Sequence, residues 1–287
     1  MATSEKPAAA AGSLKVGTFE VNRMAFGAMR ITGNGIWGEP HDRDGAKAVL
    51  RRAVDLGVNF IDTADSYGPE VSELLIAEAL YPYNGVVVAT KGGMLRDGPG
   101  RWRPECTPEH LRAACDGSLR RLNVETIDLY QLHTVDRKVP YEDSIGALKT
   151  LQDEGKVRHI GVSNVNEEQL KVAQSIVEIV SVQNRYNLGY RSSERVLDAC
   201  DSLGIAFLPW HPLAVGDLAQ RGGWLDDIAA EHDATQGQIA LAWLLHRSPV
   251  MVPIPGTSTV EHLDENVHAA RLHLSDDDVE GIAAAAG

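Results

Sequence analysis

Short apolar runs alternate with longer amphipathic stretches along most of this chain. The runs are rich in β-branched residues and apolar at consecutive positions, as in Val86-Val87-Val88, which is typical of parallel strands buried on both faces. The stretches between them predict helices. The predicted strands are 24–28, 58–61, 86–90, 127–132, 157–162, 179–183, 205–210 and 250–254. The predicted helices are 43–56, 71–80, 108–121, 141–154, 167–177, 193–203, 224–231, 235–247, 259–270 and 276–285.

Capping residues support these boundaries. Side chains that commonly accept a hydrogen bond at a helix N-terminus stand directly before three of the predicted helices, and they are Thr107, Asn166 and Ser275. Glycines, which tolerate the left-handed backbone at a helix C-terminus, end three others, and they are Gly57, Gly155 and Gly204.

Eight strand–helix units within roughly 250 residues match a (β/α)8 TIM barrel. A short β-hairpin over 14–21, turning at Gly17, is expected before the first unit. Residues 1–12 are expected to form a disordered tail, which leaves 13–287 as a single barrel domain. A doubly wound open sheet in two halves is the alternative, but no shift in composition divides the chain, which favours the barrel.

One glycine-rich motif points toward that alternative. Residues 33–38 spell G-x-G-x-x-G after a predicted strand, as in a Rossmann dinucleotide loop. In that fold the loop opens directly into a helix whose N-terminus holds the pyrophosphate. Here residues 39–42 intervene, and no acidic residue ends a strand about 20 positions later. We therefore interpret 33–38 as a flexible loop over the barrel mouth that presents Trp37 to a substrate.

Composition excludes several classes of function. The formal net charge of −13 over 287 residues argues against nucleic acid or an anionic membrane as partner. Cys106, Cys115 and Cys200 form no C-x-x-C pair, so neither disulfides nor a metal site are expected. No signal-peptide pattern opens the chain, and no apolar run reaches the ~20 residues of a membrane helix. We expect a soluble cytoplasmic protein.

Polar residues follow directly after three consecutive predicted strands, and they are Asp62, Lys91 and His133. Their spacing is close to one strand–helix unit each, so we expect them on neighbouring strands about 5 Å apart. Tyr67 lies in the loop after the first of these strands. Since α/β folds carry their chemistry at the carboxyl edge of the sheet, the four side chains are predicted to share a pocket.

These four side chains suit the reduction of a carbonyl group. A free tyrosine has a pKa of about 10, too high for an efficient proton donor, and a nearby ammonium lowers it. Asp62 can keep Lys91 charged and aim it at Tyr67, while His133 can orient and polarise a carbonyl oxygen. No side chain supplies a hydride, so a nicotinamide cofactor is implied.

Each of the four residues also has an ordinary structural explanation, as a turn former, a strand-end cap or a hydrogen-bonded core residue. Their occurrence together in consecutive units favours catalysis. An isomerase or aldolase that forms a Schiff base through Lys91 is an alternative chemistry.

Further motifs lie downstream, and they are Gly161-Val162-Ser163-Asn164, Val182-Gln183-Asn184, Ile254-Pro255-Gly256-Thr257-Ser258 and Glu265-Asn266. Together with Asp62, Tyr67, Ala89-Thr90-Lys91 and Leu132-His133, they resemble the aldo-keto reductases in family order and over essentially the whole chain. The resemblance implies a (β/α)8 barrel and an NAD(P)H-dependent oxidoreductase that reduces an aldehyde or ketone. Tyr67 would be the general acid, Lys91 its pKa modifier, Asp62 the partner of Lys91 and His133 the carbonyl orienter.

The resemblance also implies a set of cofactor contacts. Ser163, Asn164 and Gln183 would hold the nicotinamide carboxamide, and Trp210 would stack on its ring. The remaining implied contacts are Pro212, Leu213, Gly256, Thr257, Ser258, His262, Glu265 and Asn266. Family members that favour NADPH often carry a lysine and an arginine where this chain has Gly256 and His262. NADPH is still the expected cofactor, with NADH as the alternative, because Thr257, Ser258 and His262 can contact the 2′-phosphate.

Within the family, residues 26–29, 39–44 and 78–83 are most similar to the pyridoxal reductases (pyridoxine 4-dehydrogenases). This branch implies reduction of an aromatic aldehyde such as pyridoxal to pyridoxine, with Trp37 or Trp102 stacking on the ring. A catalytically weak, cofactor-sensing regulatory subunit of the same fold is the alternative function.

Overall fold

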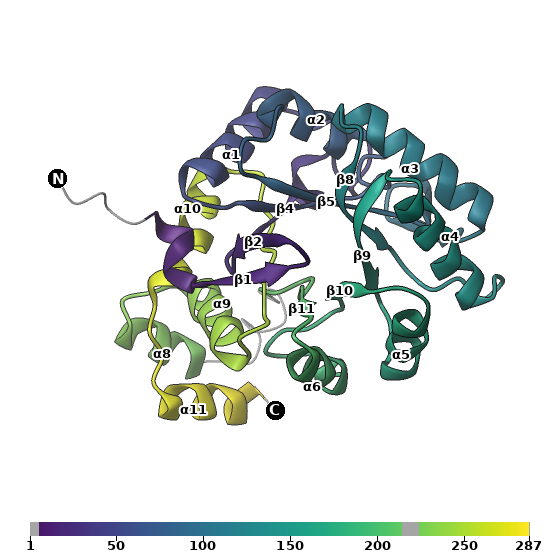
Figure 1. Cartoon of the computed structure of the whole chain (residues 1–287). Coiled ribbons are helices and arrows are strands. Elements are labelled where there is room, and N and C mark those ends of the chain that lie inside the picture. Colours follow the sequence, from purple (N-terminus) through teal and green to yellow (C-terminus); the bar gives the residue numbers. More distant parts are fainter. Residues whose placement is uncertain (1–5, 214–223, 287) are drawn as a thin grey trace.

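Seven parallel strands form one curled sheet in the order β11-β10-β9-β8-β5-β4-β3. This arrangement comes from a computed structural model, which describes residues 6–213 and 224–286. Helices surround the strands on the outside (Figure 1). The strands are β3 (Phe26–Gly27), β4 (Phe60–Asp62), β5 (Val87–Gly92), β8 (Ile127–Leu132), β9 (Val157–Ser163), β10 (Ile179–Gln183) and β11 (Ala206–Phe207). The predicted (β/α)8 barrel is confirmed, and the doubly wound sheet is excluded.

The helices begin where the capping residues predict. Thr107 accepts the N–H of His110, Asn166 forms a capping box with Gln169, and Ser275 accepts the N–H of Asp278. The helices are α1 (Arg43–Asp55), α2 (Val71–Leu80), α3 (Pro108–Leu122), α4 (Tyr141–Asp153), α5 (Glu167–Ile176), α6 (Glu194–Leu203), α8 (Trp224–Glu231), α9 (Gln236–Arg247), α10 (Val260–His268) and α11 (Asp276–Ala286). Short 3-10 helices are η1 (Pro7–Ala11), η2 (Ala28–Ile31) and η3 (Ala269–Arg271). No helix of the described residues is long and apolar enough to cross a membrane.

The eighth position in the barrel wall is occupied by an extended segment rather than by the strand predicted over 250–254. It bridges β11, where Phe207 donates to Val250 and accepts from Val252 (both 2.8 Å). On its other side it accepts the N–H groups of Ala25 and Gly27 through the carbonyls of residues 253 and 255. Both residues are prolines, which have no N–H to return. The ladder to β3 is therefore one-sided, which leaves β3 shorter than predicted.

Alternation along the strands separates two apolar layers. Phe60 and Val87 belong to the cluster inside the barrel, whereas Ile61 and Val88 belong to the layer under the helices. Successive strand residues point to opposite faces of a sheet. A residue two positions beyond an interior residue therefore also points inward, and this parity places the polar side chains described below.

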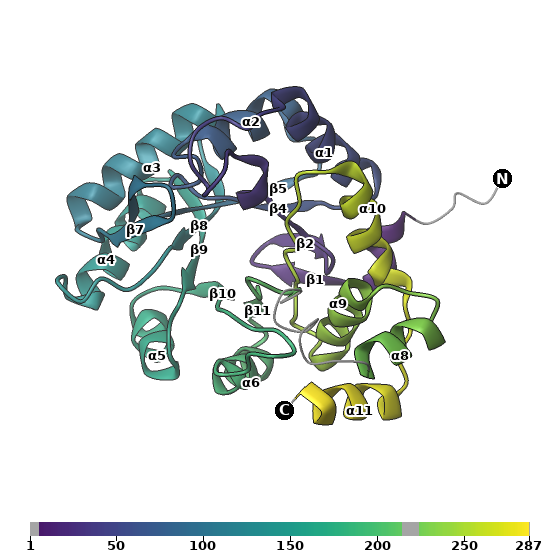
Figure 2. The ribbon, with the colours of Figure 1, turned by 180° about the vertical axis from the view of Figure 1, so that it is seen from behind.

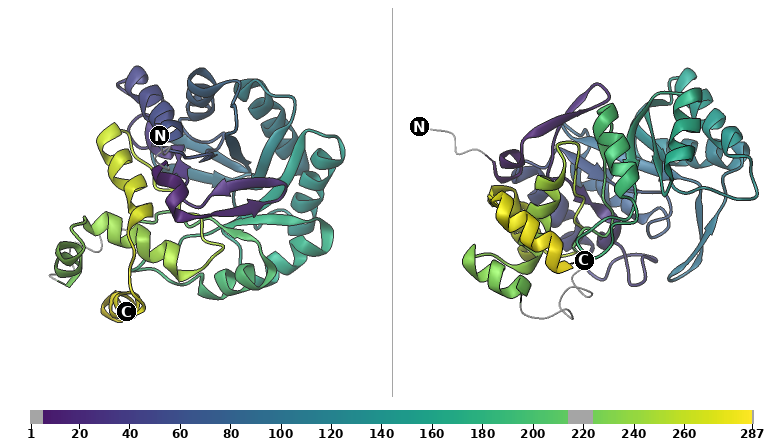
Figure 3. Two further views of the ribbon diagram at one scale, coloured as in Figure 1. Left: turned by 60° about the vertical axis from the view of Figure 1, so that its left-hand side comes forward. Right: turned by 90° about the horizontal axis from the view of Figure 1, so that it is seen from below.

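The hairpin expected at the N-terminus is present as β1 (Ser13–Val16) and β2 (Phe19–Asn22). It lies across one end of the barrel (Figures 1 and 3), and Val16 and Val21 pack into the interior cluster. Seen from behind, the opposite end carries the loops that follow the strands (Figure 2). The barrel is therefore closed at the amino ends of its strands, which leaves the carboxyl ends for a site.

The structure differs from the predicted tail over 1–12. Pro7–Ala11 forms η1, Ala8 is fully buried, and its N–H donates to Leu56 (3.0 Å). Proline is well suited to the first turn of a helix, and a small apolar side chain such as Ala8 can pack closely on the barrel. Residues 1–5 lie outside the described residues, and the assignment of 13–287 to one domain stays a prediction.

A second hairpin that the sequence analysis did not predict rises beside the carboxyl end of the barrel. It consists of β6 (Met94–Gly98) and β7 (Arg101–Pro104) and carries Trp102. The G-x-G-x-x-G segment, in contrast, lies where it was expected, as a loop before α1. Gly38 donates to Gly68 (2.5 Å), directly after Tyr67.

Candidate active site

Because alternate residues of a strand point to the same face of the sheet, several polar side chains point inward at the carboxyl end of the barrel. Asp62 lies two positions after the interior residue Phe60, and Lys91 lies two positions after interior Ala89. On β8, Leu129 belongs to the interior, and Gln131 and His133 follow it on the same inward face at steps of two residues. The strands β4, β5 and β8 are neighbours in the sheet, as predicted. The side chains therefore meet above the apolar barrel interior.

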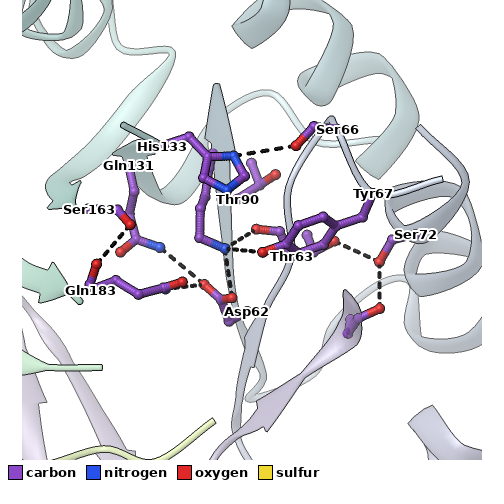
Figure 4. Close-up of polar contacts among 12 residues, drawn as sticks. Asp62, Thr63, Ser66, Tyr67, Ser72, Thr90, Gln131, His133, Ser163 and Gln183 are labelled. Atoms are coloured by element: carbon purple, nitrogen blue, oxygen red, sulfur yellow. Dashed lines mark hydrogen bonds and ion pairs between the residues drawn. The ribbon is translucent and has the colours of Figure 1, made fainter. Parts of the chain in front are cut away.

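Lys91 is the centre of this group, and its hydrogen-bond partners Asp62, Thr63 and Tyr67 are labelled in Figure 4. Its side chain is fully buried, and Nζ donates to Asp62 Oδ2 (2.7 Å), the Thr63 carbonyl (2.8 Å) and the Tyr67 hydroxyl (3.2 Å). These acceptors use all three ammonium hydrogens. Burial alone would lower the pKa of Lys91, but Asp62 and Tyr67 outweigh it and raise the pKa above its ordinary value. Lys91 is therefore an ammonium at neutral pH.

Asp62 accepts from Lys91 at one carboxylate oxygen and from two glutamine amides at the other. Its Oδ1 accepts from Gln183 (2.8 Å) and from Gln131 (3.1 Å). Gly161 on β9 leaves room for Gln131 and for Ser181, since a Cβ atom there would lie 2.9 Å from Gln131 and 2.1 Å from the Ser181 hydroxyl. Three donors converge on one carboxylate, which fixes its orientation.

Tyr67 reaches the pocket from the loop between β4 and α2. Its oxygen accepts from Lys91, so its own O–H is left to donate elsewhere. Burial raises the pKa of the phenol above 10.0, while Lys91 lowers it and Asp62 raises it further. The sequence pattern predicts that the effect of Lys91 dominates, but the effect of burial on the pKa of Tyr67 is larger because the ring is almost completely enclosed. Tyr67 is therefore a fully protonated phenol at neutral pH.

His133 lies edge-on to the ring of Tyr67, with ring centroids 5.8 Å apart. Burial, together with the positive charges of Lys91 and Arg96, holds the pKa of His133 well below 6.5. The Ser66 hydroxyl lies 3.3 Å from Nδ1. A hydrogen bond from Ser66 to Nδ1 would place the ring proton on Nε2, which is then free to donate to a ligand.

Two tryptophans lie at the mouth of the pocket, and each exposes more than a third of its surface. Trp102 makes edge contacts with the rings of both Tyr67 (6.3 Å) and His133 (6.2 Å). Trp37 pairs through its backbone with Gly68. Trp102 therefore borders Tyr67 and His133 directly, whereas Trp37 belongs to the surrounding loop.

The residues expected at the nicotinamide form one connected chain beside Asp62. Ser163 donates to the carbonyl of Gln183 (2.7 Å) and accepts from Asn164 (3.0 Å). Asn164 also binds the His133 carbonyl (3.0 Å) and accepts from the indole N–H of Trp210 (3.0 Å). The indole of Trp210 is half-buried and held in place by this bond.

The residues expected near the adenosine lie together on a different part of the rim, around the start of α10 and the loop after β11. Thr257 accepts the N–H of Thr259 (3.2 Å), and Glu265 accepts from Thr235 (2.6 Å). Asn266, Thr257 and Pro212 are buried, Glu265, Leu213 and Gly256 are half-buried, and Ser258 and His262 are exposed.

These residues fit a nicotinamide dinucleotide. An amide oxygen has two lone pairs, so Asn164 Oδ1 keeps one acceptor site for a carboxamide after binding Trp210. The fixed indole offers a flat surface for a stacked ring. At Gly256 a Cβ atom would lie 2.5 Å from the Gly27 carbonyl, which excludes any side chain there. Arg30, an exposed residue, lies beside Gly256, and its Cγ is 3.6 Å from that Cβ position.

Four residues of this region are not predicted from the sequence, and they are Gln131, Ser66, Arg30 and Arg96. Gln131 had a usable signal, because it lies on the same strand face as Leu129 and His133. Arg96 has no such signal, although the Pro99-Gly100 pair at the turn of its hairpin is a common turn sequence. Arg30 became visible only through its distance to Gly256.

Known proteins resemble the chain over nearly all its length. The model of the aldo/keto reductase family matches residues 23–286. An uncharacterised oxidoreductase of Schizosaccharomyces pombe is 53% identical over 96% of this chain and 90% of its own. Pyridoxine 4-dehydrogenase of Escherichia coli is 45% identical over 91% of this chain and 94% of its own. An aldo-keto reductase of Klebsiella pneumoniae, solved with NADPH, has a TM-score of 0.79 at 25% identity and covers 92% of this chain and 90% of its own.

Proposed function

Because the chain belongs to the aldo/keto reductase family, we propose that it reduces aldehydes to alcohols with NADPH, and that its substrates are aromatic aldehydes of the pyridoxal class. The observation that carries this proposal is the Lys91 ammonium between Asp62 (2.7 Å) and the Tyr67 hydroxyl (3.2 Å), with His133 facing the same space.

In this reaction Tyr67 gives its proton to the carbonyl oxygen. Its O–H is available because Lys91 occupies a lone pair of the oxygen rather than the hydrogen. The phenolate that remains is stabilised by the Lys91 ammonium, which Asp62 keeps charged. When bound, the nicotinamide supplies the hydride that the carbonyl carbon accepts. His133 donates a hydrogen bond to the carbonyl oxygen from Nε2 and orients it toward Tyr67.

Two observations support NADPH over NADH. The related reductase of Klebsiella pneumoniae was solved with NADPH. In this chain Arg30 lies beside Gly256, where the backbone leaves no room for a side chain. A guanidinium there can bind a phosphate in a two-pronged manner and can compensate for the lysine that position 256 lacks.

Two observations also support an aromatic aldehyde. The Escherichia coli relative at 45% identity is a pyridoxine 4-dehydrogenase. Trp102, which contacts both Tyr67 and His133, borders the space above the reacting groups with an aromatic surface. A planar ring stacked there gains both buried area and favourable ring geometry.

The charge state of Lys91 argues against a Schiff-base enzyme. That chemistry needs a neutral amine as nucleophile, which enzymes obtain by lowering the pKa of a lysine. Here Asp62 and Tyr67 raise the pKa of Lys91 despite its burial. The regulatory-subunit alternative is separated from the reductase by the following experiment.

The experiment measures aldehyde-dependent NADPH oxidation by the wild type and by Tyr67→Phe, with pyridoxal and other aromatic aldehydes. We expect the variant to lose roughly 10²–10⁴-fold in kcat, the usual contribution of a general acid. Tyr83→Phe is the matched control, because its hydroxyl binds the Leu122 carbonyl (2.7 Å) at the opposite end of α2. A wild type as inactive as Tyr67→Phe on every aldehyde would favour the regulatory function instead.

A further inference from the structure

Arg96 of β6 connects three separate segments at the mouth of the pocket. It donates to the carbonyls of Ile36 (2.6 Å) and Gly35 (2.8 Å) in the loop 33–38. It also donates to the Ser66 carbonyl (3.2 Å), the peptide group directly before Tyr67. The loop 33–38, the Tyr67 loop and the hairpin β6–β7 are thus joined by one side chain.

The remaining hydrogen bonds of Arg96 stay within its own hairpin. Its nitrogens donate to the carbonyls of Gly98 and Arg101, both at 3.3 Å. A guanidinium has five N–H donors, and five carbonyls receive them. The side chain is therefore committed to the protein backbone rather than to an anionic ligand.

The flat face of the same guanidinium lies on Trp102. The central carbon of Arg96 is 3.7 Å from the centroid of that ring and 5.8 Å from the centroid of Trp37. A cation this close to an indole face is attracted by the ring quadrupole. Since Trp102 in turn contacts Tyr67 and His133, Arg96 lies one layer behind the wall of the pocket.

The loop that Arg96 holds has an unusual backbone. Ile36 has φ +57°, a left-handed conformation that a β-branched residue rarely adopts. Such a conformation persists only where its surroundings fix it. The short bond from Arg96 to the Ile36 carbonyl is one of the interactions that do so.

We propose that Arg96 is a positioning residue for carbonyl reduction, which holds Trp102 against Tyr67 and His133 so that an aromatic aldehyde can bind. This inference rests on the proposed function and extends it. Lysine cannot replace arginine in this role, because it has three donors in place of five and no planar group to lie on the indole. Arg96 acts through Trp102 and the loops, and it does not contact the reacting atoms.

The test compares Arg96→Met and Arg96→Lys with the wild type on two substrates, pyridoxal and the small aliphatic aldehyde propanal. A loosened binding wall weakens ground state and transition state alike, so KM should rise while kcat changes less. We expect KM for pyridoxal to rise about tenfold, equivalent to about 1.4 kcal/mol, in both variants. KM for propanal, which is too small to need the aromatic wall, should change less than about threefold.

Arg103→Met is the matched control, since Arg103 lies on the same hairpin and forms ion pairs with Asp97 and Glu105 near the surface. It should leave both KM values unchanged. A double variant with Trp102→Leu shows whether Arg96 acts through Trp102. If it does, Arg96→Met adds no further rise in KM to that of Trp102→Leu.

Three outcomes would overturn the proposal. They are an unchanged KM in both Arg96 variants, a loss of active protein at unchanged KM, and additive effects of Arg96→Met and Trp102→Leu. Arg96→Lys keeps the charge and supplies the comparison if Arg96→Met does not fold. A wild type without any aldehyde reduction would instead refute the proposed function, so the two failures are distinguishable.

Discussion

Replacing Asp62 by asparagine preserves the shape of the side chain and removes one acceptor from the centre of the site. In the native protein the carboxylate accepts from Lys91 at one oxygen and from Gln131 and Gln183 at the other. An amide presents N–H groups in place of one oxygen, so some donor must then face another donor. Gln131 cannot relieve this by turning its own amide without losing the hydrogen bond from Ser181 (3.3 Å).

The expected size of the effect follows from these contacts. A hydrogen bond to a charged group is worth about 1.5–3 kcal/mol, and each ~1.4 kcal/mol of transition-state stabilisation is a factor of ten in rate. If the Lys91–Asp62 bond contributes this much to stabilising the transition state, kcat for pyridoxal should fall roughly 10–150-fold.

The variant should also change the pH dependence. Asp62 raises the pKa of Lys91 against the effect of burial, and it raises the pKa of Tyr67 as well. Without that negative charge both pKa values fall, so the basic limb of the kcat profile should move to lower pH.

The assay is steady-state NADPH oxidation over a range of pH, with NADPH affinity measured separately by fluorescence. Asp128→Asn is the control, because it removes the same charge from β8, where Asp128 accepts the backbone N–H of Val88 (3.4 Å). The reasoning fails if Asp62→Asn retains both the turnover and the basic limb of the wild type. A loss of activity explained by unfolded protein, judged by circular dichroism, would count as a structural effect only.

Three further predictions concern the surroundings of the site. The pKa of His133 is held well below 6.5 by burial and by Lys91 and Arg96, so the unfolded chain binds more protons here and stability is lost as pH falls below about 6.5. His133→Gln should flatten this loss in urea unfolding, and a curve parallel to the wild type would contradict it. Arg121→Met leaves the fully buried carboxylate of Glu73 without its ion-pair partner (2.6 Å). The free energy of unfolding, measured by heat or urea, should fall by about 3–5 kcal/mol. A fall below about 1 kcal/mol would show that this ion pair contributes no more than an exposed one. Arg30→Met should raise the Kd of NADPH about tenfold and leave the Kd of NADH unchanged in fluorescence titrations. An equal rise in both Kd values would show that Arg30 does not bind the 2′-phosphate.

The barrel and the catalytic group were predictable because both depend on patterns that are local in sequence. Parallel strands are buried on both faces, which produces continuous apolar runs. The polar residue that ends each run then marks the carboxyl edge, and Asp62, Lys91 and His133 met there as expected. The eighth strand was harder to predict, because its partners on either side are distant in sequence and its two prolines remove donors from only one of its ladders.

Electrostatic predictions depend on burial, which a sequence does not display. The ammonium of Lys91 does lower the pKa of Tyr67, as the sequence suggested, but enclosure of the phenol has the larger effect in the opposite direction. In the proposed reaction Tyr67 would therefore start fully protonated. The stabilising role of Lys91 then applies to the phenolate formed during proton transfer, where an opposite charge in a buried site is most effective.

The G-x-G-x-x-G loop shows why a motif needs its structural surroundings. In a dinucleotide fold the backbone N–H groups of such a loop face a pyrophosphate. Here the N–H groups of Trp37 and Gly38 donate to other carbonyls of the protein, and the loop's own carbonyls accept from Arg96, a residue 60 and 61 positions away. With these groups already paired, the loop has little left to offer a phosphate. The same glycines that permit close approach to a ligand in one fold permit close approach of a guanidinium in this one, and that guanidinium lies on the tryptophan beside the catalytic tyrosine.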